Sequence, residues 1–110
     1  MDDIIRSLHS VQFHCNSEEE LQDGIAELFP SAEREVRLSG TDRIDFLIGG
    51  IGIEVKMAGS LAGVTRQLHR YAQSERVNAL ILVTTKHRHD MLPSYINGKR
   101  LEVCVIEIGM

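Results

Sequence analysis

The sequence is poor in cysteine, proline and aromatic residues, has no tryptophan and carries no excess of positive charge. Its two cysteines, Cys15 and Cys104, are too few and too far apart for a disulfide framework or a four-cysteine zinc site, so both are expected to be reduced thiols. The net charge of -4 argues against a nonspecific nucleic-acid binder, which usually has a basic excess. No apolar run reaches the length of a membrane span, and the acidic start lacks the basic region of a secretory signal. A cytoplasmic protein without a membrane partner is therefore expected.

A single domain is expected over residues 1–110, because no internal repeat and no proline- or glycine-rich linker divides the chain. Its 110 residues are enough for one hydrophobic core and too few for two. Hydrophobic residues at 43% and charged residues at 25% are ordinary values for a globular protein. The acidic charge is unevenly spread, since several acids fall between Glu18 and Glu35 and the basic residues cluster elsewhere.

The most informative segment is residues 43–56, in which two apolar runs flank Gly49-Gly50. Such a pair supplies the positive φ angles that a two-residue hairpin turn requires, so a β-hairpin is predicted. Counting outward from the turn places Asp45 directly opposite Glu54, with Cβ atoms about 4.5 to 5.5 Å apart. Because side chains alternate along a strand, Lys56 is expected on the same face as Glu54. The other face is predicted to be a continuous apolar surface formed by Ile44, Phe46, Ile48, Ile51, Ile53 and Val55.

Two carboxylates directly opposite each other destabilise a strand pair, so a compensating partner such as a divalent cation is expected. The simpler alternative is that Lys56 and Arg43 neutralise the two acids on a solvated face. Against this alternative, the polar face interrupts a strongly hydrophobic hairpin. The surrounding segments also predict a sheet that is covered on both faces.

A mixed sheet flanked by helices is predicted from the remaining segments. Asn16-Ser17 followed by three glutamates is typical of a helix start, and Pro30 ends that helix. The type of the first fourteen residues stays open. The other predicted elements are a strand over 33–38, a helix over 61–76, a buried strand over 79–85, a basic loop over 86–89, a short helix over 90–95 and a strand over 101–108.

Two polar residues fall beside the apolar stripes of the predicted helices. Glu18 lies three residues before Leu21 and so on the inward face, although Glu19 and Glu20 are competitors because the helix register is uncertain. Gln67 falls at the edge of the stripe of the second helix.

These residues, in this order, resemble the PD-(D/E)XK nuclease superfamily, whose αβββαβ core carries an Asp on its second strand and a Glu-x-Lys on its third. Asp45 and Glu54-Val55-Lys56 match that pattern, and Glu18 and Gln67 match an acid and a glutamine that many members carry on the two helices. The resemblance covers residues 17 to about 85 and is closest to small stand-alone phage and archaeal members that include Holliday-junction resolvases. It implies an α/β, restriction-endonuclease-like fold with a central mixed sheet flanked by helices. One departure is that Ile44 replaces the proline for which the family is named.

The resemblance implies a metal-dependent DNA endonuclease that hydrolyses phosphodiester bonds. Glu18, Asp45, Glu54 and the Val55 carbonyl would hold Mg²⁺, for which Mn²⁺ would substitute. Lys56 would orient or deprotonate the attacking water and stabilise charge on the phosphate, and Gln67 would hold a water, a phosphate or Lys56.

The partners implied are DNA and a second copy of the chain, because a two-fold homodimer would present two sites to a branched junction. Selectivity for branched or junction DNA is a further expectation, since the sequence contains no recognisable base-reading module. If a phage encodes the chain, its location would be the host cytoplasm. Candidates for contacts with the phosphate backbone are Arg66, Arg70, Lys86 and Arg88, with Lys99 and Arg100 as further basic residues, although each alone could be a solvated charge.

Other interpretations stay open. His87-x-His89 has a spacing that could ligate a transition metal, but no further ligand lies nearby in the sequence, so zinc binding is not expected. The fold could be a nuclease-like one that has lost catalysis and acts as a nucleic-acid-binding or assembly module. It could also be an unrelated small α/β protein whose hairpin acids are structural.

Overall fold

The structure, a computed structural model, describes residues 1–109 and contains four helical segments and eight strands. In chain order they are α1 (Asp2–His9), β1 (Phe13–His14), α2 (Glu18–Leu28), β2 (Glu33–Arg37), β3 (Arg43–Ile48), β4 (Ile51–Lys56), α3 (Leu61–Ala72), β5 (Ala79–Thr84), the 3-10 helix η1 (His87–Met91), β6 (Tyr95–Ile96), β7 (Lys99–Val105) and β8 (Ile108–Gly109).

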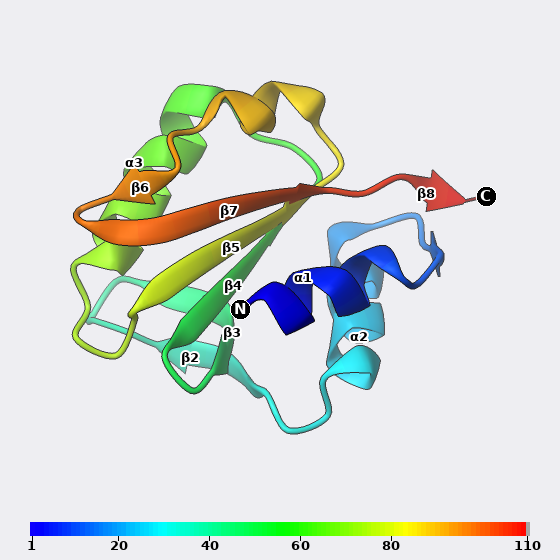
Figure 1. The fold of residues 1–110 in the computed structure, drawn as a ribbon, viewed down its shortest axis with the longest axis horizontal. Helices are drawn as coiled ribbons and strands as arrows, with labels where there is room; N and C mark the ends of the chain where they lie inside the picture. The colour runs from blue at the N-terminus through cyan, green and yellow to red at the C-terminus, as the bar shows by residue number, and fades with distance from the viewer. Residues whose placement is uncertain (110) are drawn as a thin grey trace.

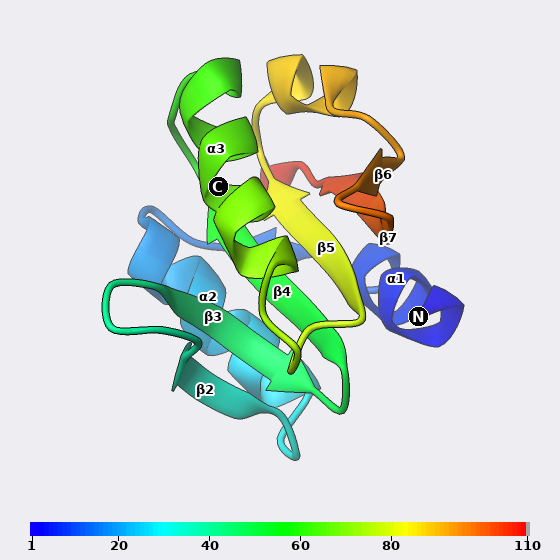
Figure 2. The same cartoon turned by 90° about the vertical axis from the view of Figure 1, so that its left-hand side faces the viewer.

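A six-stranded mixed sheet lies at the centre of the fold, with the strand order β2-β3-β4-β5-β7-β6. Strands β4, β5 and β7 are parallel, whereas β2, β3 and β6 each run antiparallel to a neighbour. Helices α1 and α2 lie on one side of the sheet and α3 on the other (Figure 1, Figure 2). The predicted α/β architecture, a mixed sheet flanked by helices, is confirmed. A separate two-stranded sheet joins β1 to β8 near the ends of the chain.

Side-chain caps fix where the two long helices begin. The Ser17 hydroxyl accepts a hydrogen bond from the Glu20 N–H at the start of α2, and the Ser60 hydroxyl accepts one from the Gly63 N–H at the start of α3. Each cap satisfies a backbone donor that the first helical turn leaves without a partner. The helix that the Asn16-Ser17 pattern predicts therefore begins at Glu18.

The β3–β4 hairpin turns at Gly49-Gly50, as the sequence predicts, with Gly49 at a φ of 58°. Its paired residues are Ile48 with Ile51, Leu47 with Gly52 and Phe46 with Ile53, which is the register obtained by counting from the turn. Gly52 is also tightly packed, because a Cβ at this position would lie 2.5 Å from Cδ1 of Ile44, so that this buried side chain would have to move.

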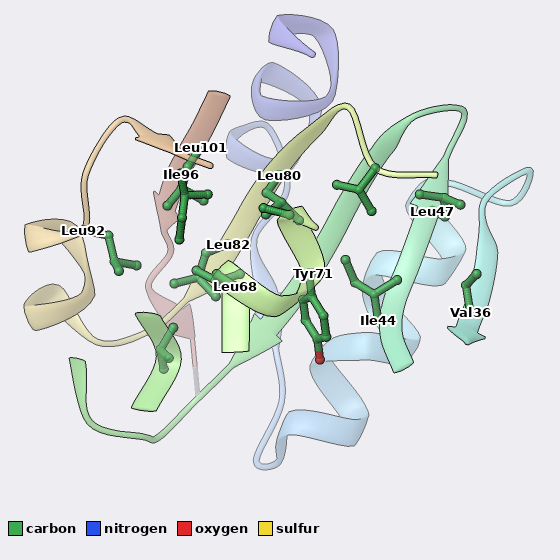
Figure 3. Close-up of a cluster of buried hydrophobic side chains, with 13 residues drawn as sticks. Val36, Ile44, Leu47, Leu68, Tyr71, Leu80, Leu82, Leu92, Ile96 and Leu101 are labelled. Atoms are coloured by element: carbon green, nitrogen blue, oxygen red, sulfur yellow. The ribbon is translucent and has the colours of Figure 1, made fainter. Parts of the chain in front are cut away.

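Two apolar cores cover the two faces of the sheet. The core under α1 and α2 contains Phe46, Ile53 and Val55, and the core under α3 contains Leu47, Leu80 and Leu82 (Figure 3). Ile44 was predicted to share a face with Phe46, but it packs in the α3 core instead. The alternation of side chains between the two faces of the sheet therefore fails in β3 between Ile44 and Phe46, at Asp45.

Three predicted elements differ from the structure by more than one residue, whereas β2 and β5 each end one residue before their predicted bounds. The helix predicted over 61–76 ends at Ala72, because Ser74 bonds the N–H groups of Arg76 and Val77 and turns the chain toward β5. The helix predicted over 90–95 is wrong: the 3-10 helix η1 spans His87–Met91, from the predicted basic loop into the first two residues of the predicted helix, and Leu92 is extended, as expected before Pro93. The final strand, predicted over 101–108, spans Lys99–Val105.

The remaining segments settle points that the sequence left open. The first fourteen residues form α1 and the short strand β1. Both cysteines are free and buried. None of the helices within residues 1–109 has the length and apolar character that crossing a membrane requires.

Candidate functional site

The β3–β4 ladder ends where the two predicted acids meet. Beyond the Phe46–Ile53 pair, the Asp45 N–H donates to Oε1 of Glu54 at 3.2 Å, and the Val55 N–H donates to Oδ2 of Asp45 at 2.8 Å. Carboxylate oxygens thus accept hydrogen bonds that a neighbouring strand's carbonyls usually accept. Asp45 and Glu54, predicted to be directly opposed, are therefore not paired in the ladder, and the crossed bonds to their carboxylates bring the two acids together.

Glu54 is one of the few buried charged residues, with 3% of its surface exposed. The Tyr71 hydroxyl lies 3.2 Å from its Oε2, and Lys56 Nζ lies 3.5 Å from the same oxygen. The Lys56 side chain is 22% exposed, so it reaches from this buried carboxylate toward solvent. A buried carboxylate is costly unless it is paired and hydrogen-bonded, and these contacts supply both.

The two carboxyl groups hold a proton more tightly than ordinary carboxyls. Burial, together with the charge of Asp45, raises the pKa of Glu54 to about 8, although Lys56 opposes this. Burial also raises the pKa of Asp45, against the hydrogen bond from the Val55 N–H. Two acids that repel each other in a partly desolvated place favour any cation that can replace the proton.

Tyr71, on the buried face of α3, is a site residue that was not predicted from the sequence. It lies within the α3 core, with its hydroxyl oxygen at the rim of the cluster (Figure 3). This oxygen lies 3.1 Å from the Arg43 carbonyl and accepts a hydrogen bond from Nε2 of Gln67 at 2.7 Å. Burial and the nearby Glu54 raise the pKa of Tyr71 above its usual value, so the hydroxyl keeps its proton and can donate.

Gln67 therefore donates to Tyr71, which was not among its predicted partners, and within residues 1–109 it makes no hydrogen bond to the predicted partner Lys56. A signal for this pair was present in the sequence. Tyr71 follows Gln67 by four residues, so the two side chains meet on one helix face, and a buried phenol needs a hydrogen-bond partner.

The structure distinguishes the three glutamates at the start of α2. Oε1 of Glu18 accepts a hydrogen bond at 3.0 Å from the N–H of Met57, the first residue after β4. Glu19 and Glu20 are exposed, and Glu20 accepts from the Asn16 N–H at 3.2 Å. The negative charge of Glu18 also contributes to the raised pKa of Asp45, so Glu18 is the acid that faces the pair.

A cavity of about 290 Å³ is lined by Glu18, Lys56, Gln67 and the segment that starts α3; Asp45 and Glu54 do not line it, and Lys56 connects it to Glu54. It lies at the carboxyl end of β4, the edge at which α/β sheets usually bind ligands. Since one water occupies about 30 Å³ in the liquid, the space equals roughly ten waters. It can therefore admit a hydrated cation and a phosphodiester group.

The oxygen atoms at this site are of the type that a hard cation such as Mg²⁺ binds. Among residues 1–109, no group of three or more His, Cys, Asp or Glu side chains is arranged to hold a metal ion. Mg²⁺, however, usually takes only one or two protein carboxylates and completes its shell with water and substrate phosphate. The adjoining carboxylates of Asp45 and Glu54 meet that smaller requirement, with Glu18 and the Val55 carbonyl as nearby oxygen donors.

The four basic residues predicted to contact phosphate differ in how they are held. Arg70 bonds Asp42 at 3.0 Å, and Arg88 donates to the Gly59 carbonyl from both Nε and Nη2. No side-chain hydrogen bond or ion pair holds Arg66 or Lys86 within the described part of the chain. The further candidates Lys99 and Arg100 are bound to Ser74, Asp2 and Glu102.

Comparison with family models, with curated proteins and with solved structures finds no match for this chain. The function therefore has to be argued from the fold and from the chemistry of the site.

Proposed function

We propose that the protein is a metal-dependent nuclease that hydrolyses phosphodiester bonds in DNA, built on a restriction-endonuclease-like core. The observation that carries this proposal is the buried Glu54, paired with Asp45 and Lys56 beside a cavity at the carboxyl edge of the sheet. Buried carboxyl groups with a raised pKa destabilise the fold when they are ionised, and they are typical of functional sites.

Asp45 and Glu54 would hold Mg²⁺ or Mn²⁺, and Glu18 and the Val55 carbonyl would ligate the ion directly or through water. The bound ion supplies charge neutralisation at the phosphate and a water of lowered pKa. Tyr71, held by Gln67, fixes the orientation of the Glu54 carboxylate from the α3 side.

Lys56 is the group of this chain best placed to act on the reacting phosphate. Its ammonium lies near Glu54 and lines the cavity, and its side chain is partly open to solvent. From there it can orient a water for attack and donate a hydrogen bond to a phosphate oxygen as negative charge develops. Once a metal ion replaces the Glu54 proton, the charged carboxylate would hold the Lys56 ammonium in this position before substrate arrives.

The nucleic acid would be held mainly through its backbone. Arg66 on the exposed face of α3 and Lys86 after β5 have side chains available for phosphate contacts, which position DNA without reading its sequence. A bound divalent ion offsets part of the net charge of -4. We extend the proposal to a homodimer that prefers branched DNA.

The test is a cleavage assay on labelled duplex, flap, single-stranded and four-way-junction DNA with Mg²⁺, Mn²⁺ or EDTA. We expect cleavage with either metal and none with EDTA. Asp45→Asn, Glu54→Gln and Lys56→Ala should each lower the rate at least about 10³-fold while the fold is retained. Glu19→Gln, at an exposed acid of the same helix turn, is the matched control and should cleave at the wild-type rate.

The same preparation separates the main alternative, a binding or assembly module without catalysis. Gel-shift titration of the same DNA panel measures binding independently of cleavage. Binding without metal-dependent cleavage of any substrate would contradict the nuclease proposal and favour that module. Wild-type cleavage by any of the three site variants would contradict the residue assignment.

A further inference from the structure

His89 is a fully buried histidine for which the proposed chemistry has no role. Its Nε2 lies 2.9 Å from the Gly59 carbonyl oxygen, and its Nδ1 lies 2.6 Å from Oγ1 of Thr84. A carbonyl oxygen can only accept a hydrogen bond, so Nε2 carries the proton in the neutral ring and Nδ1 accepts from the Thr84 hydroxyl. The Gly59 carbonyl thus sets the tautomer, and the Thr84 hydroxyl holds the ring from its other nitrogen.

Gly59 belongs to the segment 57–60, which joins β4 to α3. Its φ of +105° is one that residues with a side chain rarely adopt, so the path of the segment depends on this glycine. The segment is held at both ends: Glu18 accepts from the Met57 N–H, and His89 donates to the Gly59 carbonyl.

The position of this segment shapes the candidate site. Gly59, Ser60 and Gly63 line the same cavity as Lys56 and Gln67. Lys56 is the last residue of β4, directly before the segment, and Ser60 caps the helix that carries Gln67 and Tyr71. A shift of residues 57–60 would therefore move both walls of the cavity.

Arg88 also donates to the Gly59 carbonyl, but its side chain is exposed. The bond from His89 is part-buried, and its donor is a side chain with no exposed surface that Thr84 also holds. The His89 ring is therefore the donor that the fold keeps in place, whereas the exposed Arg88 can exchange its bond for one to water.

We propose that His89 is a positioning residue for the proposed nuclease reaction: through its Nε2–H···O bond to Gly59 it fixes residues 57–60, and with them part of the lining of the cavity that Lys56 and Gln67 share. This inference rests on the proposed function. A displacement of about 1 Å at a reacting group can lower the rate about 10²-fold, so a residue outside the cavity can control catalysis in this way.

The test compares His89→Leu, which removes both hydrogen bonds, with His89→Gln, whose side-chain amide can still donate to Gly59. Amide hydrogen exchange and steady-state cleavage are measured on both. His89→Leu should speed exchange of the amides of residues 59–63 at least about tenfold and lower kcat about 10- to 100-fold, with KM within about twofold. His89→Gln should stay within about threefold of wild type in both readouts. His69→Leu, at an exposed histidine of α3, is the control and should match wild type.

Wild-type exchange and kcat in His89→Leu would overturn the inference. Equal defects in His89→Leu and His89→Gln would also overturn it, because donation to Gly59 would then be irrelevant. If His89→Leu does not fold, Thr84→Val removes the hydroxyl that holds Nδ1 and so frees the ring to turn away from Gly59. It should change exchange and kcat in the same direction, with Thr84→Ser restoring both. Unchanged exchange in Thr84→Val would equally contradict the role of His89.

The exchange measurement separates the two proposals. If the wild-type protein cleaves no DNA, the nuclease proposal fails, and with it any role of His89 in that reaction. Fast exchange confined to residues 59–63 of His89→Leu would still show that His89 fixes the segment. Wild-type cleavage together with unchanged exchange would leave the nuclease proposal standing and refute the role of His89.

Discussion

Replacing Glu54 with Gln should change how the stability of the protein depends on pH. The pKa of this carboxyl is raised from 4.5 to about 8 by burial and by Asp45. Because the folded state binds the proton more tightly than the unfolded chain, Glu54 contributes stability that is fully present below about pH 4.5 and is lost as pH rises through about 8.

The size of the effect follows from the same two values. One pKa unit corresponds to about 1.4 kcal/mol, so the interval from 4.5 to about 8 corresponds to a loss of up to roughly 5 kcal/mol. Such a loss is a large part of the usual stability of a domain. Gln is uncharged and can keep the contact with Tyr71, so Glu54→Gln should lose most of this pH dependence.

The assay is urea unfolding of wild type, Glu54→Gln and the exposed control Glu19→Gln at pH 5, 6, 7 and 8 without divalent cations. The free energy of unfolding of Glu54→Gln minus that of wild type should grow by several kcal/mol between pH 5 and pH 8. The control should follow wild type throughout. A difference that stays constant, or shrinks as pH rises, would refute the assignment of a raised pKa to Glu54.

Three further outcomes are expected. Tyr71→Phe removes the hydroxyl next to the buried glutamate and should lower the cleavage rate about tenfold or more while costing about 1 kcal/mol of stability, measured by kinetics and unfolding. Gly52→Ala places a Cβ 2.5 Å from a δ-carbon of Ile44 and should destabilise the fold by about 1–3 kcal/mol, whereas Gly40→Ala, with no atom within 4 Å, should not. Arg66→Gln should reduce the slope of log affinity for DNA against log salt by about one, and an unchanged slope would exclude this phosphate contact.

The hairpin and its acids were predictable because local rules decide them. The Gly49-Gly50 turn fixes the register, so counting from it gives the observed pairs as far as Phe46 and Ile53. The apolar run of β5 predicted that both faces of the sheet are covered, and the cap residue Ser17 predicted where α2 begins. In each case neighbouring residues carry the information.

Tertiary contacts decided what the sequence did not predict. The face of Ile44 depends on carboxylates bonding backbone N–H groups across the hairpin, which breaks the alternation at Asp45. The hydroxyl of Tyr71 has a role only because Glu54 and Gln67 converge on it from separate elements. The role of His89 depends in the same way on its hydrogen bond to Gly59, which lies thirty residues earlier in the chain.

One local signal was overlooked in the sequence. Asn97-Gly98 is a strong hairpin turn pair, and the two residues have φ angles of 49° and 74° in the turn between β6 and β7. Together with Pro93, which keeps Leu92 extended, this pair accounts for the absence of the helix predicted over 90–95.

The central claim is that Asp45 and Glu54 hold a divalent cation that the protein needs to cleave DNA. The most direct measurement is the initial rate of cleavage of labelled DNA by wild type and by Asp45→Asn, purified in parallel, with Mg²⁺ and with EDTA. We predict products only from wild type with Mg²⁺. Equal product from Asp45→Asn, or wild-type cleavage that persists in EDTA, would contradict the claim.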